Sequence, residues 1–123
     1  MHTAENLITH FFDWWNDAYR ENCFSTEGFA RYFTPNATFI VDGNLRGTGP
    51  EEINRHFQRI KRESDDVEIV TPAITTLSDK AVGFVRYRAT FRAGNLTGTE
   101  ECLAWACMRE DKISAIEIFS RPA

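Results

Sequence analysis

A chain of 123 residues with 42% hydrophobic residues is long enough to fold as one domain, residues 1–123, without disulfides or a structural metal. Its net charge of −4 argues against a nucleic-acid-binding surface, and no apolar run resembles a signal peptide or a membrane span. The three cysteines, Cys23, Cys102 and Cys107, have no metal-ligand spacing. We therefore expect a cytoplasmic protein with reduced thiols, no metal, no cofactor, no nucleic-acid partner and no membrane partner.

The first third of the chain is predicted to be mainly helical. Apolar residues recur at helical spacing over 3–21, which indicates a helix that is buried along most of its length. A short second helix is expected over 25–33, with Ser25 or Thr26 as its N-cap. A strand over 37–42 and then a loop are expected to follow.

A third helix is predicted to begin at Gly49-Pro50. Proline is favoured at the first helical position, and the two glutamates that follow suit the positive end of the helix dipole. The inner face of this helix consists of Ile53, His56, Phe57 and Ile60. The outer face is polar and consists of Asn54, Arg55, Gln58, Arg59, Lys61 and Arg62.

From residue 66 onward the apolar pattern has a period of two, which predicts β-strands. The strands are expected over 66–77, 80–93, 97–109 and 112–120. The turns between them are placed at Ser78-Asp79, Gly94-Asn95 and Glu110-Asp111. Helices followed by such a meander form an α+β arrangement, and strands this long require the sheet to curl strongly or to bulge.

Alternation decides which face of the strand over 80–93 meets the helices. The apolar set, expected inside, is Val85, Tyr87, Ala89 and Phe91, whereas the other set contains Arg86, Arg88 and Arg92. Those arginines could hold phosphates, but the negative net charge and nearby glutamates favour solvated or interface arginines.

The strand over 97–109 has no polar set of side chains. Leu103 and Trp105 are predicted to face inward, and the outer face is assigned to Cys102, Ala104, Ala106 and Met108. An outer face this apolar indicates that something covers it. We expect a homodimer built on the outer sheet face.

A family resemblance is carried by Tyr32-Phe33-Thr34-Pro35-Asn36-Ala37-Thr38, Gly49-Pro50-Glu51-Glu52-Ile53, Glu100-Glu101 with Trp105, and the closing strand Ile116 to Ser120. With these segments the chain resembles the nuclear transport factor 2-like superfamily over nearly its whole length. That superfamily includes SnoaL-like polyketide cyclases and ketosteroid isomerases. The resemblance implies a cystatin-like cone, in which a curved mixed or antiparallel sheet wraps around the N-terminal helices and encloses a pocket. The second half is especially similar to the association domain of calmodulin-dependent kinase.

The resemblance does not bring the isomerase chemistry with it. Ketosteroid isomerases use a tyrosine on the first helix, an aspartate base on the first strand and a protonated acid on the third meander strand. The corresponding positions here hold Phe11, Val41, and Leu103 or Ala104, none of which is polar. The resemblance therefore implies the pocket without the isomerase oxyanion hole.

Three titratable residues are candidates for acid–base chemistry. His56 lies on the inner face of the third helix, where the alternative to a proton-transfer group is a core histidine bonded to a backbone carbonyl or a hydroxyl. Asp42 either turns inward as a base or forms a turn with Gly43. Glu117 faces either the cavity or the open sheet face, beside the arginines of a neighbouring strand.

The pocket is predicted to be lined by Phe11, Trp15, Phe39, Phe57, Tyr87, Leu103 and Trp105. Such a lining indicates a small, apolar ligand. The first hypothesis is an enzyme of isomerase, cyclase or dehydratase type that acts on a carbonyl- or hydroxyl-bearing molecule, with His56 carrying the proton and Asp42 or Glu117 assisting. The alternatives are a non-catalytic ligand-binding domain and a dimeric assembly module of the same fold.

Overall fold

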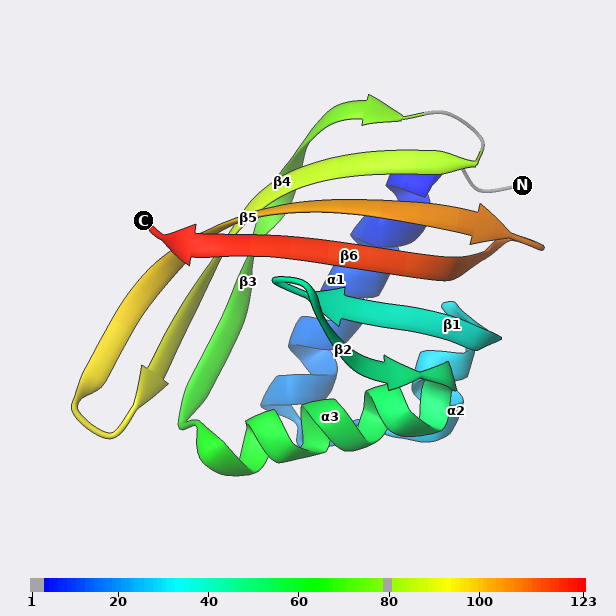
Figure 1. The fold of residues 1–123 in the computed structure, drawn as a ribbon. Helices are drawn as coiled ribbons and strands as arrows, with labels where there is room; N and C mark the ends of the chain where they lie inside the picture. Colours follow the sequence, from blue (N-terminus) through cyan, green and yellow to red (C-terminus); the bar gives the residue numbers. More distant parts are fainter. Residues whose placement is uncertain (1–3, 79–80) are drawn as a thin grey trace.

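The computed structural model describes residues 4–78 and 81–123, and within them it contains three helices and six strands. The helices are, in chain order, α1 (Ala4–Arg20), α2 (Thr26–Ala30) and α3 (Gly49–Glu63), and all three are labelled in Figure 1. The predicted starts of α2 and α3 are confirmed to within a residue. None of the helices in these two ranges is long and apolar enough to cross a membrane.

The strands form one six-stranded sheet in the order β2-β1-β6-β5-β4-β3. Strands β1 and β6 are parallel, and the other neighbouring pairs are antiparallel. The bounds are β1 (Phe33–Val41), β2 (Asn44–Thr48), β3 (Asp66–Ser78), β4 (Val82–Ala93), β5 (Leu96–Arg109) and β6 (Lys112–Pro122). The predicted α+β class with a mixed sheet is therefore confirmed. The predicted turn at Ser78-Asp79 lies partly outside the described residues.

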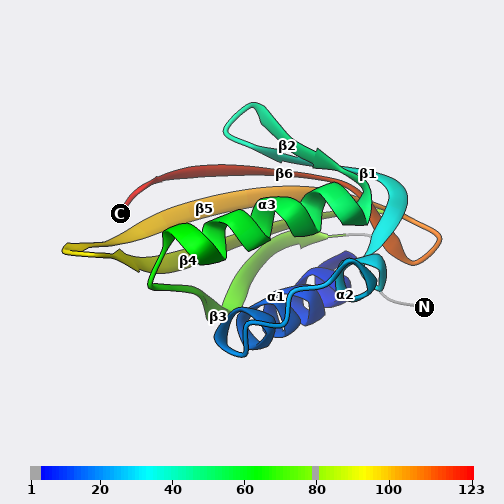
Figure 2. The same cartoon turned by 90° about the horizontal axis from the view of Figure 1, so that it is seen from below.

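The sheet curves around the helices (Figures 1 and 2). Helix α1 packs on β3 and β4, whereas α3 packs on β1 and β2. Aromatic rings fill much of the space between helices and sheet, and the rings of Phe29 in α2 and Phe57 in α3 stack with their centroids 5.5 Å apart. Two helices that cover different parts of one curved sheet leave room between them, and this is where the cavity described below lies.

The segment after β1 is a strand rather than the predicted loop. Asp42 and Gly43 both have positive φ, 49° and 80°, which is the backbone of the two-residue turn that an Asp-Gly pair favours between antiparallel strands. The turn pairs Val41 with Asn44 and so adds β2 to the edge of the sheet. The loop prediction is wrong because Asp42-Gly43 is a hairpin turn between two strands and not an isolated turn.

Helix α2 ends three residues before the predicted position, at Ala30. Ser25 is its N-cap, since the Ser25 Oγ accepts a hydrogen bond of 3.0 Å from the Gly28 N–H. After the helix, the Tyr32 carbonyl accepts a hydrogen bond of 2.7 Å from the Ile113 N–H. This bond to β6 draws the chain into strand β1 at Phe33.

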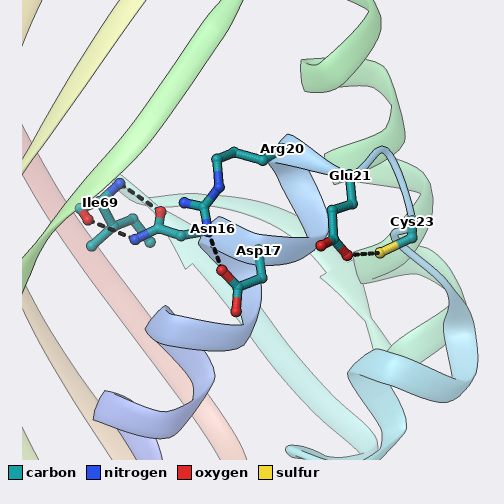
Figure 3. A network of polar contacts seen from close by, with 6 residues as sticks. All are labelled: Asn16, Asp17, Arg20, Glu21, Cys23 and Ile69. Carbon is teal, nitrogen blue, oxygen red and sulfur yellow. Dashed lines mark hydrogen bonds and ion pairs between the residues drawn. The ribbon is translucent and has the colours of Figure 1, made fainter.

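Asn16 joins α1 to the edge strand β3 (Figure 3). Its side-chain oxygen accepts a hydrogen bond of 2.8 Å from the Ile69 N–H, and its side-chain nitrogen donates one of 2.7 Å to the Ile69 carbonyl. Because β3 is an edge strand, it has backbone groups that no strand pairs. Asn16 satisfies two of them and is itself buried.

The predicted facing of β5 is wrong. Ala104 and Ala106 are 0% exposed and Cys102 is buried as well, whereas Leu103 is 44% exposed. The cause is the register with β4, which places Val85 opposite Ala104 and Arg86 opposite Leu103. Residues that are directly opposite share a face, so the alanines follow Val85 inward and Leu103 follows Arg86 outward. Alternation within β5 could not decide this because both sets are apolar.

Candidate functional site

A cavity of about 400 Å³ lies between α1, α3 and the inner face of the sheet. Its lining combines an apolar majority with a few charged and polar groups. The apolar part includes Phe11, Phe12, Trp15, Phe39, Val41, Phe57, Ile60, Val67, Ile69, Ala89 and Ile118. The polar part consists of Arg46, His56, Arg59, Glu63, Tyr87, Glu100, Cys102 and Ser120. A cavity of this size and composition suits a small organic molecule.

Five of the seven residues predicted to line the pocket lie around this cavity: Phe11, Trp15, Phe39, Phe57 and Tyr87. The other two, Leu103 and Trp105, do not, because β5 faces the opposite way from the prediction. The cavity is lined instead by their neighbour on the inward face, Cys102. The small inward side chains of β5 leave space on the inner face of the sheet, and Leu103 and Trp105 would fill this space if they faced inward.

His56 lies where the helical spacing of α3 predicted it. The ring is buried against Phe39 and Phe57, with centroid distances of 6.0 and 4.9 Å, and it lines the cavity. Its Nδ1 is 3.0 Å from the Arg59 guanidinium. A guanidinium only donates hydrogen bonds, so Nδ1 must be the acceptor, and in the neutral ring the proton is on Nε2. Within the described residues no hydrogen-bond partner is found for Nε2.

The surroundings of His56 keep it neutral. Burial lowers the pKa of its imidazole to about 4, and the positive charges of Arg59 and Arg46 contribute to the same shift. At neutral pH the ring is therefore uncharged, with Nδ1 occupied by Arg59 and Nε2–H available as a donor. A ring in this state polarises a carbonyl oxygen better than it removes a proton.

The structure keeps Asp42 away from the cavity. Its carboxylate accepts hydrogen bonds of 2.8 and 2.7 Å from the backbone N–H and the Oγ of Ser120 on β6. These two bonds lower the pKa of the Asp42 carboxyl, and the bond from the Ser120 hydroxyl has the larger effect. Asp42 thus links the β1–β2 turn to β6. Its φ of 49° belongs to the turn, so the turn alternative describes Asp42 and the inward-facing base does not.

Glu117 lies on the outer face of the sheet. It is paired with Trp105 across the β5–β6 ladder, and its carboxylate accepts a hydrogen bond of 3.0 Å from the Trp105 Nε1–H. Its neighbours along β6, Ile116 and Ile118, are buried on the inner face. The open-face alternative therefore holds for Glu117, with Trp105 in place of the predicted arginine partners.

The sequence prediction did not include Arg46 and Arg59 in the site. Arg46 belongs to β2, which was predicted as a loop, and Arg59 was assigned to the outer face of α3. The spacing of three residues between His56 and Arg59 was a usable signal, because residues at this spacing are neighbours on a helix surface. A long arginine side chain at the boundary of the apolar face reaches the rim of a cavity that the face covers.

Tyr87 and Cys102 form the part of the lining that comes from β4 and β5. Burial raises the pKa of the Tyr87 hydroxyl well above its usual value. Burial likewise raises the pKa of the Cys102 thiol to about 11, so the thiol stays protonated at neutral pH. Neither group is a nucleophile under these conditions. In the described part of the chain, no three His, Cys, Asp or Glu side chains lie together as a metal site.

The outer face of the sheet carries a second hollow, of about 630 Å³. It is lined by Val70, Arg86, Arg88, Glu101, Leu103, Phe119 and Arg121, among others. Glu101 forms ion pairs with Arg88 and Arg121 at 3.4 and 3.0 Å. Leu103 and Phe119 are 44% and 45% exposed. We call this surface the outer groove.

No protein-family model matches the sequence, and no curated protein matches it significantly. Solved structures do match. An NTF2-like protein from Burkholderia xenovorans LB400 has a TM-score of 0.75 at 17% identity, over 98% of this chain and 92% of that one. A protein from Jannaschia sp. CCS1, provisionally named a SnoaL-like polyketide cyclase, has a TM-score of 0.74 at 11% identity, over 94% of this chain and 83% of that one.

An M. tuberculosis LEH-like epoxide hydrolase is also similar, with a TM-score of 0.68 at 10% identity over 94% of this chain and 84% of that one. These likenesses cover nearly the whole chain although few residues are identical. The special similarity of the second half to the kinase association domain stays a prediction. The arrangement of helices and sheet is what all these proteins share, and this chain has the nuclear transport factor 2-like fold.

Proposed function

We propose that the cavity binds a small, largely apolar molecule with a carbonyl or hydroxyl group, and that His56 is the polar contact for that group. The observation that carries the proposal is the state of His56. It is a buried, neutral imidazole beside the cavity, with Nδ1 occupied by Arg59 and no partner found for Nε2. A donor beside an apolar cavity that has no protein partner gains a hydrogen bond when a ligand acceptor binds there.

The walls of the cavity support the apolar part of this ligand. Phe11, Trp15, Phe39 and Phe57 surround it from α1, β1 and α3. Placing an apolar group against such rings removes apolar surface from water, at about 25 cal/mol per Å². A few polar groups among aromatic walls then fix the orientation of the ligand.

The test compares two probes of one shape, acetonaphthone and ethylnaphthalene. Acetonaphthone has a carbonyl oxygen that can accept the His56 Nε2–H, and ethylnaphthalene has none. We expect acetonaphthone to bind about fivefold to tenfold more tightly, as one buried hydrogen bond is worth about 1 kcal/mol. His56→Leu should remove this preference and His56→Gln should retain part of it, since glutamine can donate. The quenching of tryptophan fluorescence by each probe gives the dissociation constants.

Equal affinities for the two probes in the natural protein would contradict the role of His56. Failure of both probes to bind would contradict the apolar pocket itself. Thermal melting of each variant checks that it is folded before its affinity is interpreted. Asp42→Asn, which alters a carboxylate outside the cavity, should leave the preference for acetonaphthone unchanged.

A second form of this proposal is that the protein is an enzyme and converts the molecule bound in this cavity. The LEH-like epoxide hydrolase is named as an enzyme of this fold. Here the neutral His56 would stabilise negative charge that develops on a carbonyl oxygen, and Glu100, a carboxylate in the lining, would accept a proton from the adjacent carbon. Exchange of deuterium into the methyl group of acetonaphthone, which Glu100→Gln should abolish, would distinguish an enzyme from a binding protein.

The outer groove favours a second role, as an interface between two copies of this chain. Leu103 and Phe119 are exposed there, and the groove carries both Glu101 and several arginines, so a twofold-related copy can present opposite charges. The predicted dimer surface consisted of Cys102, Ala104, Ala106 and Met108, but Cys102, Ala104 and Ala106 are buried on the inner face. The outer groove takes the place of that surface in this proposal. We expect a dimer in sedimentation velocity, and Leu103→Asp with Phe119→Asp should yield monomers. A natural protein that sediments as a monomer at high micromolar concentration would contradict this role.

A further inference from the structure

Two arginines from different elements line the same cavity as His56. Arg46 comes from β2 and Arg59 from α3, and both side chains are exposed. Within the described residues neither of them forms an ion pair with a carboxylate. Ion pairs are formed instead by Arg20, Arg55, Arg88, Arg92 and Arg121. The cavity thus has two positive charges on its rim that its own carboxylates do not pair.

The geometry at Arg59 leaves most of its hydrogen-bonding capacity unused. One terminal nitrogen of its guanidinium lies 3.0 Å from the His56 Nδ1. A guanidinium has five N–H groups in a planar fork that matches the two oxygens of a carboxylate. The bond to His56 holds the Arg59 side chain beside the cavity. It leaves the other N–H groups free for an anion.

The charges acting on His56 are positive. Apart from burial, the causes that lower the pKa of its imidazole are Arg59 and Arg46. Two carboxylates also line the cavity, Glu63 near the C-terminal end of α3 and Glu100 on β5. Neither of them counteracts the effect of the arginines on His56.

The negative charges act on the opposite wall. Glu100 and Asp42 contribute to the raised pKa values of Tyr87 and Cys102, which come from β4 and β5. The Asp42 carboxylate is itself occupied by Ser120. The two arginines thus place positive charge on the cavity rim at α3 and β2, where Glu63 also lies, and Glu100 places negative charge at β5.

We infer that the ligand of this cavity is an apolar acid, whose carboxylate binds to Arg59 and Arg46 and accepts the Nε2–H of His56. This inference rests on the proposed function, because it names the chemical class of the molecule that the cavity holds. The aromatic walls bind the apolar body, and the positive side of the cavity selects an anion over a neutral or cationic head group.

The experiment uses three probes with one apolar body: naphthylacetate, naphthylacetamide and naphthylethylamine. We expect naphthylacetate to bind at least tenfold more tightly than naphthylacetamide at low salt, and naphthylethylamine to bind most weakly. Arg59→Gln and Arg46→Gln should each reduce the affinity for naphthylacetate about tenfold and change that for naphthylacetamide less than about twofold. Both arginines are exposed, so these variants should fold.

Arg62→Gln is the matched control. Arg62 is also exposed and lies on α3, but it does not line the cavity, so its replacement changes the net charge equally without changing the site. Its affinities should stay within about twofold of the natural protein. A second readout is the pKa of His56 followed by NMR, which should rise from about 4 when naphthylacetate binds, because an adjacent anion favours the imidazolium. Naphthylacetamide should not raise it.

The outcomes separate this inference from the proposed function. If naphthylacetamide binds as tightly as naphthylacetate, or if Arg62→Gln weakens naphthylacetate as much as Arg59→Gln does, the inference is wrong and the apolar pocket stands. If none of the three probes binds, the proposed function fails and the inference fails with it. Tighter binding of naphthylethylamine would show that the negative wall selects the ligand and would also overturn the inference.

Discussion

Replacing Gly49 by alanine is expected to destabilise the protein by about 3 kcal/mol or more. Gly49 begins α3 with φ of 84°, a conformation that costs a residue with a Cβ about 1–2 kcal/mol. A Cβ at this position would also lie 2.6 Å from the backbone oxygen of Pro35, which is closer than such atoms approach. Either Pro35 or the start of α3 has to move. Urea denaturation, with equal m-values for both proteins, measures the loss.

Gly43 provides the control for this change. It has nearly the same φ, 80°, but no atom lies within 4 Å of a Cβ added there. Gly43→Ala should therefore cost only the conformational part, about 1 kcal/mol. The difference between the two variants measures the contact with Pro35. If Gly49→Ala costs no more than Gly43→Ala, the start of α3 is not held by this contact.

The position of α3 matters for the site because the helix carries both His56 and Arg59. A shift of its first turn is transmitted along a rigid helix to the wall of the cavity. Any Gly49→Ala protein that remains folded should therefore also bind acetonaphthone more weakly, whereas Gly43→Ala should not. The stability and the affinity would then fall together.

Replacing Asn16 by leucine should have a similarly large effect, about 3 kcal/mol. Leucine is of comparable size and suits a buried position, but it removes both hydrogen bonds to Ile69. The N–H and the carbonyl of Ile69 would remain buried without partners, at about 1–3 kcal/mol for each unsatisfied group. The midpoint of thermal unfolding and the exchange rate of the Ile69 amide hydrogen are the measurements. The amide should exchange faster even under conditions in which the protein remains folded.

Asp13→Ala is the comparison for Asn16. Asp13 is exposed on the same helix, and replacing a surface residue of this kind usually changes stability by less than about 0.5 kcal/mol. A loss in Asn16→Leu no greater than in Asp13→Ala would show that the bonds to Ile69 contribute nothing net. In that case α1 would be held on the sheet by its aromatic face alone.

The order of the elements was predictable from local features of the sequence. Helical periodicity, a proline at the first turn of α3 and the change to a period of two each depend on neighbouring residues only. The Glu110-Asp111 turn is an example, since both residues have positive φ, 56° and 61°, as a tight hairpin between β5 and β6 requires. The signal for strand β2, the Asp42-Gly43 pair, is also local, although the sequence prediction has a loop there.

The candidate site was predictable only in part. The placement of His56 on the inner face of α3 followed from helical spacing, and it is buried beside the cavity. The directions of the Asp42 and Glu117 side chains were ambiguous. Asp42 follows the end of β1, where alternation no longer applies, and the pattern of β6 does not decide which face Glu117 is on. Their partners, Ser120 and Trp105, are brought to them by strand pairing and cannot be read from adjacent residues.

The sequence by itself determined the α+β class, the boundaries of most elements and the inward position of His56, because each depends on periodicity or on backbone preferences of single residues. Only the tertiary structure decided which face of β5 is inside and which charges meet at the cavity. Both sets of alternating side chains in β5 are apolar, so the sequence of this strand does not distinguish its two faces. The register with β4 does, because it pairs Ala104 with the inward-facing Val85. Likewise Arg46 and Arg59, thirteen residues apart on a strand and a helix, line one cavity only because α3 packs on the β1–β2 hairpin.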